Sequence, residues 1–327
     1  MANVSSASIE PLAVRYLTAA GAAPGNAKSV VSAMLRAEVE GNTVCGLFYL
    51  PLFREQLEAG KIDGNALPLI IQPKPGTVLV DACDGFAHPA IARALPLVAN
   101  LAHANGLAAA AIQRSTNCLS LAHHVLPLAE AGLIGICVSN APASVAPPGG
   151  TRPVFGTNPM AFAVPGSNGP EIVIDQSASA VTKTMIRMHA DRGDPMPEGW
   201  AQDSSGRSTT NPEVGLAGSM LPFGGQKGAN IGLIVEVLAA VLTGSRLSVD
   251  ASTFFGPEGG PSHVGQFILA IDPAGFAEAA FQPGLERLVA RFAEDGLRMP
   301  GTRFREQPSD DTIEIDDDLW STLTAQL

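Results

Sequence analysis

Apolar residues along this chain fall into two repeating patterns, short continuous runs and longer stretches with helical spacing. The short runs are typical of strands that are buried on both faces, because such strands need no polar alternation. They lie at residues 77–82, 107–113, 135–139, 160–164, 172–175 and 265–272. The sequence therefore predicts a buried sheet in the middle of the chain.

Stretches with helical spacing precede and separate these runs. Val31, Met34 and Leu35 recur at helical intervals before a stop at Gly41. Further helices are predicted at residues 50–57, 89–104 and 121–131, after Lys227 and after Asp272. The helix after Lys227 carries the apolar set Ile231, Ile234, Val235, Leu238 and Leu242. Alternation of strands and helices predicts an α/β core.

Two glycine-rich loops interrupt this alternation. The first, within residues 147–165, contains Gly156, Thr157 and Asn158, which place a hydroxyl and an amide beside flexible backbone. A structural turn between two strands is the alternative. The second loop, residues 222–228, includes a lysine and leads into a helix, which suits an anionic ligand such as a nucleotide phosphate. Neither loop has the spacing of a P-loop or of the G-x-G-x-x-G dinucleotide motif.

Polar segments follow the run at 172–175. Asp175 and the small residues 176–179 suit a turn that faces a ligand, although a helix cap is the alternative. Residues 191–215 are rich in Gly, Pro, Asp and Ser and predict a long ordered loop with Trp200 as an anchor. The acidic residues between 310 and 318 predict a solvated end.

Composition narrows the class of protein. The 327 residues are 46% hydrophobic and 16% charged, which is typical of a compact folded protein. A net charge of -11 argues against nucleic acid or an anionic membrane surface as a partner. We find no signal peptide and no apolar run long enough to span a bilayer. The four cysteines show no metal-type pairing, so we expect reduced thiols in a cytoplasmic protein.

Seven groups of residues together carry a family resemblance. They are residues 129–135, 155–159 and 174–180, residues 197–201, 221–225 and 227–228, and residues 265–273. Their order over nearly the whole chain resembles the malate/L-lactate/L-sulfolactate dehydrogenase-like family of NAD(P)H-dependent oxidoreductases. This family includes the cyclic ketimine reductases for Δ1-piperideine-2-carboxylate and Δ1-pyrroline-2-carboxylate, which Pro127 and residues 221–225 resemble most.

The resemblance implies an α/β fold of the non-Rossmann malate/L-lactate dehydrogenase type, with a central mixed sheet and a helical region from both termini. It implies a helical region at 1–75, a cofactor- and substrate-binding core at 76–285 and a C-terminal helical region at 286–327 that packs on the N-terminal part. It also implies a homodimer and NADPH or NADH as cofactor. The cofactor-binding candidates are Asn117, Ser139, Gly156, Thr157, Ser177, Ser179, Lys183, Gly224, Gly225 and Lys227.

The chain departs from the family at the expected active site. Where relatives carry Ser-His-Gly and an arginine three residues later, this chain has Val44, Cys45, Gly46 and Tyr49. A second family histidine is replaced by Asn117, Gln226 stands where ketimine reductases have histidine, and Lys183 replaces an arginine. Histidine donates protons near neutrality, whereas cysteine has an unperturbed pKa of roughly 8.5. Tyrosine offers one hydroxyl where arginine offers a charged fork.

The histidines and Cys45 could take part in catalysis, but each could also have a purely structural role. The adjacent His123 and His124 are expected to be exposed or structural, and His263 has either a supporting role or none. No spacing of His, Cys or carboxylate residues predicts a metal site. A covalent role for Cys45 would need a base, and the sequence shows none beside it.

The residues and the resemblance together predict a reductase that transfers hydride from NAD(P)H to a C=N bond of a cyclic imine carboxylate or to a C=O bond next to a carboxylate. An imine that arrives protonated needs less help from an acid than a ketone does. Alternatives are a 2-hydroxyacid dehydrogenase of the malate/lactate type, and a family member without redox activity that acts as a ligand-binding protein or a lyase or isomerase. The catalytic candidates are Cys45, Tyr49, Thr157, Asn158 and Asp175.

Overall fold

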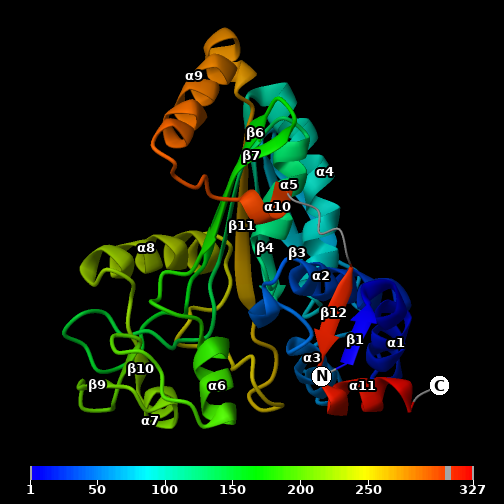
Figure 1. Cartoon of the computed structure of the whole chain (residues 1–327). Helices are drawn as coiled ribbons and strands as arrows, with labels where there is room; N and C mark the ends of the chain where they lie inside the picture. Colours follow the sequence, from blue (N-terminus) through cyan, green and yellow to red (C-terminus); the bar gives the residue numbers. More distant parts are fainter. Residues whose placement is uncertain (1, 306–310, 326–327) are drawn as a thin grey trace.

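A seven-stranded mixed sheet forms the centre of the computed structural model, which describes residues 2–305 and 311–325 (Figure 1). Its strand order is β2-β3-β4-β11-β5-β6-β7. Only β3 and β4 pair in parallel, and all other neighbours pair antiparallel. The strands are β2 (Leu69–Lys74), β3 (Thr77–Asp81), β4 (Leu107–Ser115), β5 (Ile134–Ser139), β6 (Met160–Gly166), β7 (Gly169–Gln176) and β11 (Val264–Ile271). The predicted mixed sheet is confirmed.

Helices cover the two faces of this sheet. α4 (Ala87–Asn105) and α5 (Ala122–Glu130) pack on one face, α4 on β3 and β4 and α5 on β5, β6 and β7. α8 (Gln226–Glu236) and the π-helical turn η2 (Val237–Val241) contact β5 and β11 from the opposite side, to the left of the sheet in Figure 1. The main apolar core lies between the sheet and α4 and α5, where Val80, Ile91 and Ile112 are fully buried.

The N-terminal helices form a second core beside the sheet. It contains α1 (Ser6–Ala19), α2 (Pro24–Val39), the 3-10 turn η1 (Thr43–Cys45) and α3 (Tyr49–Glu58). β1 (Ala2–Ser5) pairs antiparallel with β12 (Thr312–Ile315), and α11 (Asp317–Thr324) packs against α1. α9 (Ala274–Glu294) and α10 (Thr302–Arg305) connect β11 with this C-terminal segment (Figure 1).

The chain around residue 200 is more structured than its composition predicts. The segment 191–215, predicted as a loop, contains β8 (Ala201–Gln202), β9 (Ser208–Thr209) and the start of α7 (Pro212–Ala217). β8 pairs with β9 and with β10 (Ser219–Met220), and α6 (Lys183–Arg192) lies beside α7. A small core of Phe155, Ile186 and Met196, against which Trp200 packs, holds this region together.

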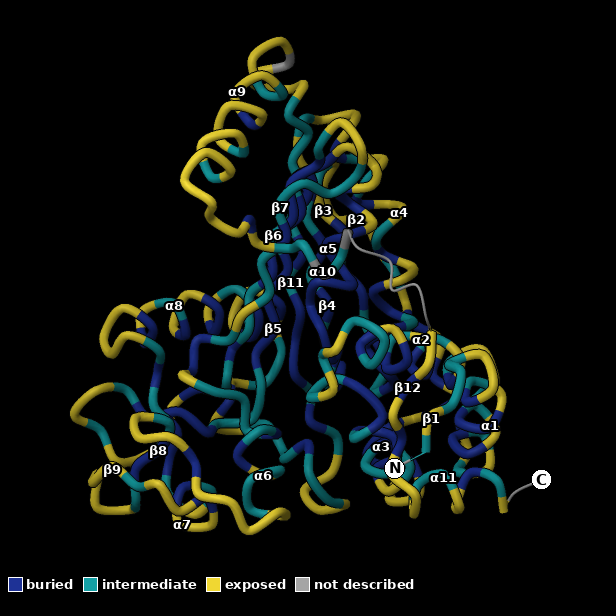
Figure 2. The backbone as a smooth tube through the Cα atoms, in the orientation of Figure 1, coloured by how far each residue is buried: buried dark blue, intermediate teal, exposed yellow. Residues whose placement is uncertain are grey.

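The acidic residues Asp311, Asp316, Asp317 and Asp318 are exposed, as predicted, while Asp310 lies outside the described residues. Two of them also have structural roles, because Asp316 caps α11 and Asp311 accepts hydrogen bonds from Ser5 and Ser6. The helix after Lys227 does not turn its whole apolar set inward. Ile234 and Leu242 are more than half exposed, whereas Val235 is fully buried. Figure 2 shows that much of α8 is exposed.

Candidate functional site

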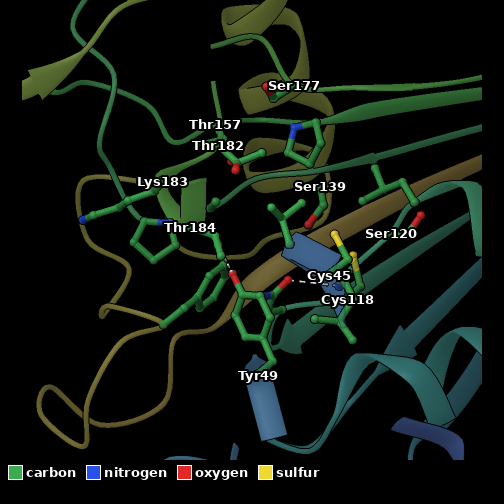
Figure 3. Close-up of a pocket in the computed structure, with 18 of the residues that line it drawn as sticks. Cys45, Tyr49, Cys118, Ser120, Ser139, Thr157, Ser177, Thr182, Lys183 and Thr184 are labelled. Carbon is green, nitrogen blue, oxygen red and sulfur yellow. Dashed lines mark hydrogen bonds between the residues drawn. The ribbon is translucent and has the colours of Figure 1, made fainter. Parts of the chain in front are cut away.

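A cavity of about 270 Å³ lies where the N-terminal core meets the ends of β5 and β7 (Figure 3). Segments from η1 and α3, the β4–α5 loop, the stretch after β5, the end of β7, the start of α6 and the loop at 253–255 all contribute to it. Among the predicted site residues, those that line it are Cys45, Tyr49, Asn117, Ser139, Thr157, Asp175, Ser177 and Lys183. Residues that are far apart in sequence thus share one cavity.

Tyr49 occupies the inner wall of the cavity at the first residue of α3. Its hydroxyl lies 2.8 Å from Thr184 Oγ1, and the ring packs near those of Phe53 and Phe255. Burial raises the pKa of Tyr49 to about 12, although hydrogen bonds with Thr184 and Asn117 oppose the rise. The hydroxyl therefore stays protonated and can donate a hydrogen bond at neutral pH.

Glu38 at the end of α2 positions the turn that carries Cys45. Its Oε1 accepts a hydrogen bond of 2.6 Å from the backbone N–H of Leu47. A side chain at Gly46 would displace this carboxylate, so glycine permits the close approach of Glu38. This arrangement directs Cys45 into the cavity, opposite Cys118 (Figure 3).

Cys118 was not predicted as a site residue, yet it lines the cavity beside Cys45. Burial raises the pKa of the Cys118 thiol to about 12. A thiol with so high a pKa remains protonated at neutral pH and is a weak nucleophile. Neither Cys45 nor Cys118 forms a disulfide. The cavity therefore contains weak sulfur donors where the resemblance predicts an imidazole.

Asp175, near the end of β7, ties two walls of the cavity together. Its Oδ2 accepts hydrogen bonds of 2.9 Å from Ser120 Oγ and from the backbone N–H of Ala122, the first residue of α5. A carboxylate at a helix N-terminus is stabilised by the helix dipole and by exposed N–H groups. Asp175 therefore lines the cavity and also caps the N-terminus of α5. Asp175 is the only carboxylate among the described residues that line the cavity.

The first glycine-rich loop brings Thr157 to the cavity through a close backbone contact. A side chain at Gly156 would collide with the backbone of Ala141, so glycine is required for the two segments to touch. Thr157 and Pro159 line the cavity on either side of Asn158.

The side chain of Asn158 points away from the cavity. It is fully buried, and its Nδ2 donates to Gly232 O at 2.9 Å and to Glu236 Oε2 at 2.8 Å. Its backbone φ of 39° lies in the left-handed region, which asparagine tolerates. The expectation that Asn158 orients a substrate does not fit this placement. The residue instead attaches the loop to α8.

Of the two predicted serines after β7, Ser177 and Ser179, only Ser177 lines the cavity. Ser177 lines the cavity, whereas Ser179 is buried behind it and donates to Val181 O at 2.5 Å. Ser139 also lines the cavity and donates to the carbonyl oxygens of Asn140 and Gly265. Ser179 thus shapes the turn, and Ser139 and Ser177 present hydroxyls to the cavity.

The second glycine-rich loop lies beside the cavity without lining it. Phe223 N donates to Ala178 O at 3.1 Å, and Ala180 N donates to Leu221 O at 2.8 Å. Gly224 and Gly225 are exposed with positive φ, and Lys227 is exposed in the first turn of α8. These residues form an open edge next to Ser177 and Ser179.

The other predicted candidates lie outside the cavity. His123 is buried against Glu40 at 2.8 Å, and His124 Nε2 lies 2.9 Å from Cys118 O, so both have structural roles. Burial lowers the pKa of His124 to about 4 and leaves its ring neutral. His263 pairs with Asp84 at 2.7 Å. No group of three or more metal-ligating side chains occurs in the described part of the chain.

Several lining residues were missed by sequence reasoning. Ser120, Thr184 and Phe255 line the cavity, as does Cys118. Ser120 and Thr184 lie within five residues of predicted site residues, so a search of the neighbouring hydroxyl side chains would have included them. Phe255 lies in a Gly- and Pro-rich loop, and no sequence pattern marks it.

Across residues 2–305 and 311–325, no helix is long and apolar enough to cross a membrane.

Comparison with known proteins assigns the chain to a family. The family model described as malate/L-lactate dehydrogenase matches residues 4–324. A (2R)-3-sulfolactate dehydrogenase (NADP(+)) of Chromohalobacter salexigens is 41% identical over 90% of this chain and 88% of its own. A Δ1-pyrroline-2-carboxylate/Δ1-piperideine-2-carboxylate reductase of Pseudomonas aeruginosa is 34% identical over 98% and 97%. The crystal structure of Δ1-piperideine-2-carboxylate reductase from Pseudomonas syringae has a TM-score of 0.91 at 32% identity and covers all of both chains. The chain therefore belongs to the malate/L-lactate dehydrogenase family of oxidoreductases, as its motifs predicted.

Proposed function

We propose that this protein is an NAD(P)H-dependent reductase of a cyclic imine carboxylate or of a C=O bond next to a carboxylate. The observation that carries the proposal is the single cavity that unites Cys45, Tyr49, Thr157 and Asp175 in a chain of this family. Relatives that are 34% identical are named as reductases of such imines. A 2-hydroxyacid dehydrogenase is the second candidate, because the relative that is 41% identical is named as a sulfolactate dehydrogenase.

The residues around the cavity fit a nicotinamide cofactor. Gly224 and Gly225 leave the first backbone N–H groups of α8 open, and Lys227 adds a positive charge in that first turn. This combination suits phosphate groups. The hydroxyls of Ser139, Thr157 and Ser177 line the adjoining cavity. When bound, the cofactor supplies the hydride.

The other residues of the cavity act on the substrate. Tyr49 donates a hydrogen bond from its hydroxyl, whose pKa of about 12 keeps it protonated at neutral pH. Asp175 places a negative charge where a protonated imine nitrogen would be stabilised. Neither the Tyr49 hydroxyl nor a thiol matches imidazole as an acid near neutrality. The site therefore suits an imine that arrives protonated better than it suits a ketone.

The first test measures cofactor binding and turnover in the purified protein. Fluorescence titration with NADPH and with NADH is expected to show micromolar binding of at least one cofactor. Oxidation of the bound cofactor, followed at 340 nm, is expected with Δ1-pyrroline-2-carboxylate or Δ1-piperideine-2-carboxylate and to be slower with pyruvate. Faster turnover of 2-oxo acids would favour the second candidate. Binding of neither cofactor would overturn both and leave a family fold without redox activity.

We also propose a homodimer, supported by an exposed apolar surface. Five large apolar side chains on the outer side of α8, η2 and the following residue are about half exposed or more: Leu233, Ile234, Val237, Val241 and Leu242. Exposed apolar surfaces of this kind mark contacts between proteins. We also propose a cytoplasmic location, because none of the four cysteines forms a disulfide.

The dimer predicts a change of mass on mutation of this surface. Light scattering of the wild-type protein is expected to give twice the 33.6 kDa of one chain. Replacing both Val237 and Val241 by glutamate places charges on the surface, and the variant is expected to run as a monomer. Leu67→Glu is the control, because Leu67 is 75% exposed on a different part of the molecule. A monomeric wild-type protein would contradict the proposal.

We further propose that the terminal regions, residues 1–75 and 286–327, fold as one unit beside the core at 76–285. Pairing of β1 with β12 and packing of α11 on α1 support this division. Two boundaries shift, because β2 (Leu69–Lys74) pairs with β3 in the central sheet and residue 285 lies inside α9. The core is therefore better taken to begin before Leu69 and to end after Glu294.

A further inference from the structure

The two charged side chains that line the cavity differ in the contacts they make with the rest of the protein. Among the described lining residues, only Asp175 and Lys183 carry charge. Asp175 accepts hydrogen bonds from Ser120 Oγ and from the backbone N–H of Ala122. In the described part of the chain, no carboxylate lies within 4.0 Å of the Lys183 ammonium group. A partly buried cation without a counter-ion is costly unless a ligand supplies the negative charge.

Lys183 belongs to the same end of the cavity as Tyr49. Its Nζ lies 5.8 Å from the centre of the Phe255 ring, and that ring lies 6.4 Å from the Tyr49 ring. The next residue along the chain, Thr184, bonds to the Tyr49 hydroxyl at 2.8 Å. Figure 3 shows Lys183 beside Thr182 and Thr184, with its side chain extended outward and its ammonium group pointing away from Tyr49. The predicted phosphate residues Gly224, Gly225 and Lys227 lie outside the cavity.

We propose that Lys183 binds the carboxylate of the substrate at this end of the cavity, a role distinct from the cofactor-phosphate contact predicted from sequence. The proposal rests on the proposed reductase function. Lys183 then supplies the positive charge that position 49 lacks, from the first turn of α6. The long, flexible stem of lysine lets the ammonium group swing toward a carboxylate, and the hydroxyls of Tyr49 and Thr184 restrict where that carboxylate lies.

Desolvation agrees with this assignment. Burial lowers the pKa of Lys183, and the positive charge of Arg187 lowers it further. A bound carboxylate would reverse both effects, because an opposite charge favours the ammonium form. A single lysine also holds a carboxylate less rigidly than the two-pronged contact of an arginine. The site is therefore expected to accept carboxylates of imines that differ in ring size.

The test separates substrate carboxylate from cofactor phosphate. Four proteins are compared: wild type, K183M, K183R and the matched control R187Q, whose residue lies on α6 with a side chain that is 53% exposed. Fluorescence gives the Kd of NADPH, and then the Kd of Δ1-pyrroline-2-carboxylate added to the NADPH complex. Δ1-Pyrroline has the same ring and imine nitrogen but lacks the carboxylate, so it serves as the probe without that negative charge.

K183M is expected to raise the Kd of Δ1-pyrroline-2-carboxylate roughly 10- to 100-fold, the usual effect of losing a charge-assisted hydrogen bond. The Kd of NADPH and that of Δ1-pyrroline should stay within about twofold of wild type, since neither bears the carboxylate. K183R should recover most of the affinity, and R187Q should match wild type.

Other outcomes overturn the proposal. A rise in the NADPH Kd alone assigns Lys183 to cofactor phosphate, and unchanged values in K183M leave it without a ligand role. If the wild-type complex binds the acid but does not reduce it, the proposed function fails while the comparison of Kd values still decides the role of Lys183. If the wild-type complex does not bind the acid, Lys183 is not an anchor for this class of carboxylate.

Discussion

Replacing Asp175 by alanine is expected to lower kcat/KM for the imine substrate by roughly 100-fold or more. The change removes the one carboxylate that lines the cavity in the described chain, and with it the acceptor for Ser120 Oγ and for the N–H of Ala122. The β4–α5 loop then loses these hydrogen bonds to β7, while the packing of α5 on β7 remains. Steady-state kinetics with Δ1-pyrroline-2-carboxylate, together with an NADPH titration, measure both consequences.

Ser120→Ala is the matched control for this variant. It removes the hydrogen bond from Ser120 Oγ to Asp175 Oδ2, leaves the one from Ala122 N and keeps the negative charge, so a loss of only about fivefold is expected. Asp175→Asn keeps an acceptor without the charge and should fall between the two. Wild-type turnover by Asp175→Ala would show that this carboxylate neither orients nor stabilises the substrate.

Replacing Glu236 by alanine is expected to destabilise the fold by about 3 kcal/mol or more. Its two carboxylate oxygens accept hydrogen bonds from Ser248 N and Ser248 Oγ at 2.6 Å and from Asn158 Nδ2 at 2.8 Å. All three residues are buried, so the donors would lose their acceptor without gaining water. Urea unfolding followed by circular dichroism gives the free energy of unfolding.

The Glu236 network also supports the cavity, and a graded series tests this link. Asn158 connects Glu236 to the loop that carries Thr157, and Ser248 O accepts from Ala143 N beside the cavity-lining segment after β5. Glu236→Gln keeps part of the network and is expected to lose less stability. Glu198→Ala, at an exposed position, should change stability by no more than about 0.5 kcal/mol. A wild-type urea midpoint for Glu236→Ala would refute the structural role.

Much of the architecture was predictable because it follows from local patterns. The apolar runs at 77–82, 107–113 and 135–139 became β3, β4 and β5, because short continuous apolar runs favour strands of a central sheet. In these strands alternate residues are buried, and most of the residues between them are half-buried. Glycine-rich loops identified the neighbourhood of the cavity, because a close backbone contact such as that of Gly156 with Ala141 excludes any side chain. The family followed from the order of its motifs.

Only the tertiary structure decided how the chemistry is arranged. Side-chain direction within a loop is not visible in composition, so Asn158 turned out to serve α8 while its neighbour Thr157 faces the cavity. The pairing of β1 with β12 joins the two ends of the chain, which local periodicity cannot encode. The sequence by itself determined the fold family and the list of candidates. Long-range packing determined that Lys183 lies with Tyr49 and Phe255 at one end of the cavity, because contact between distant segments depends on the whole assembled core.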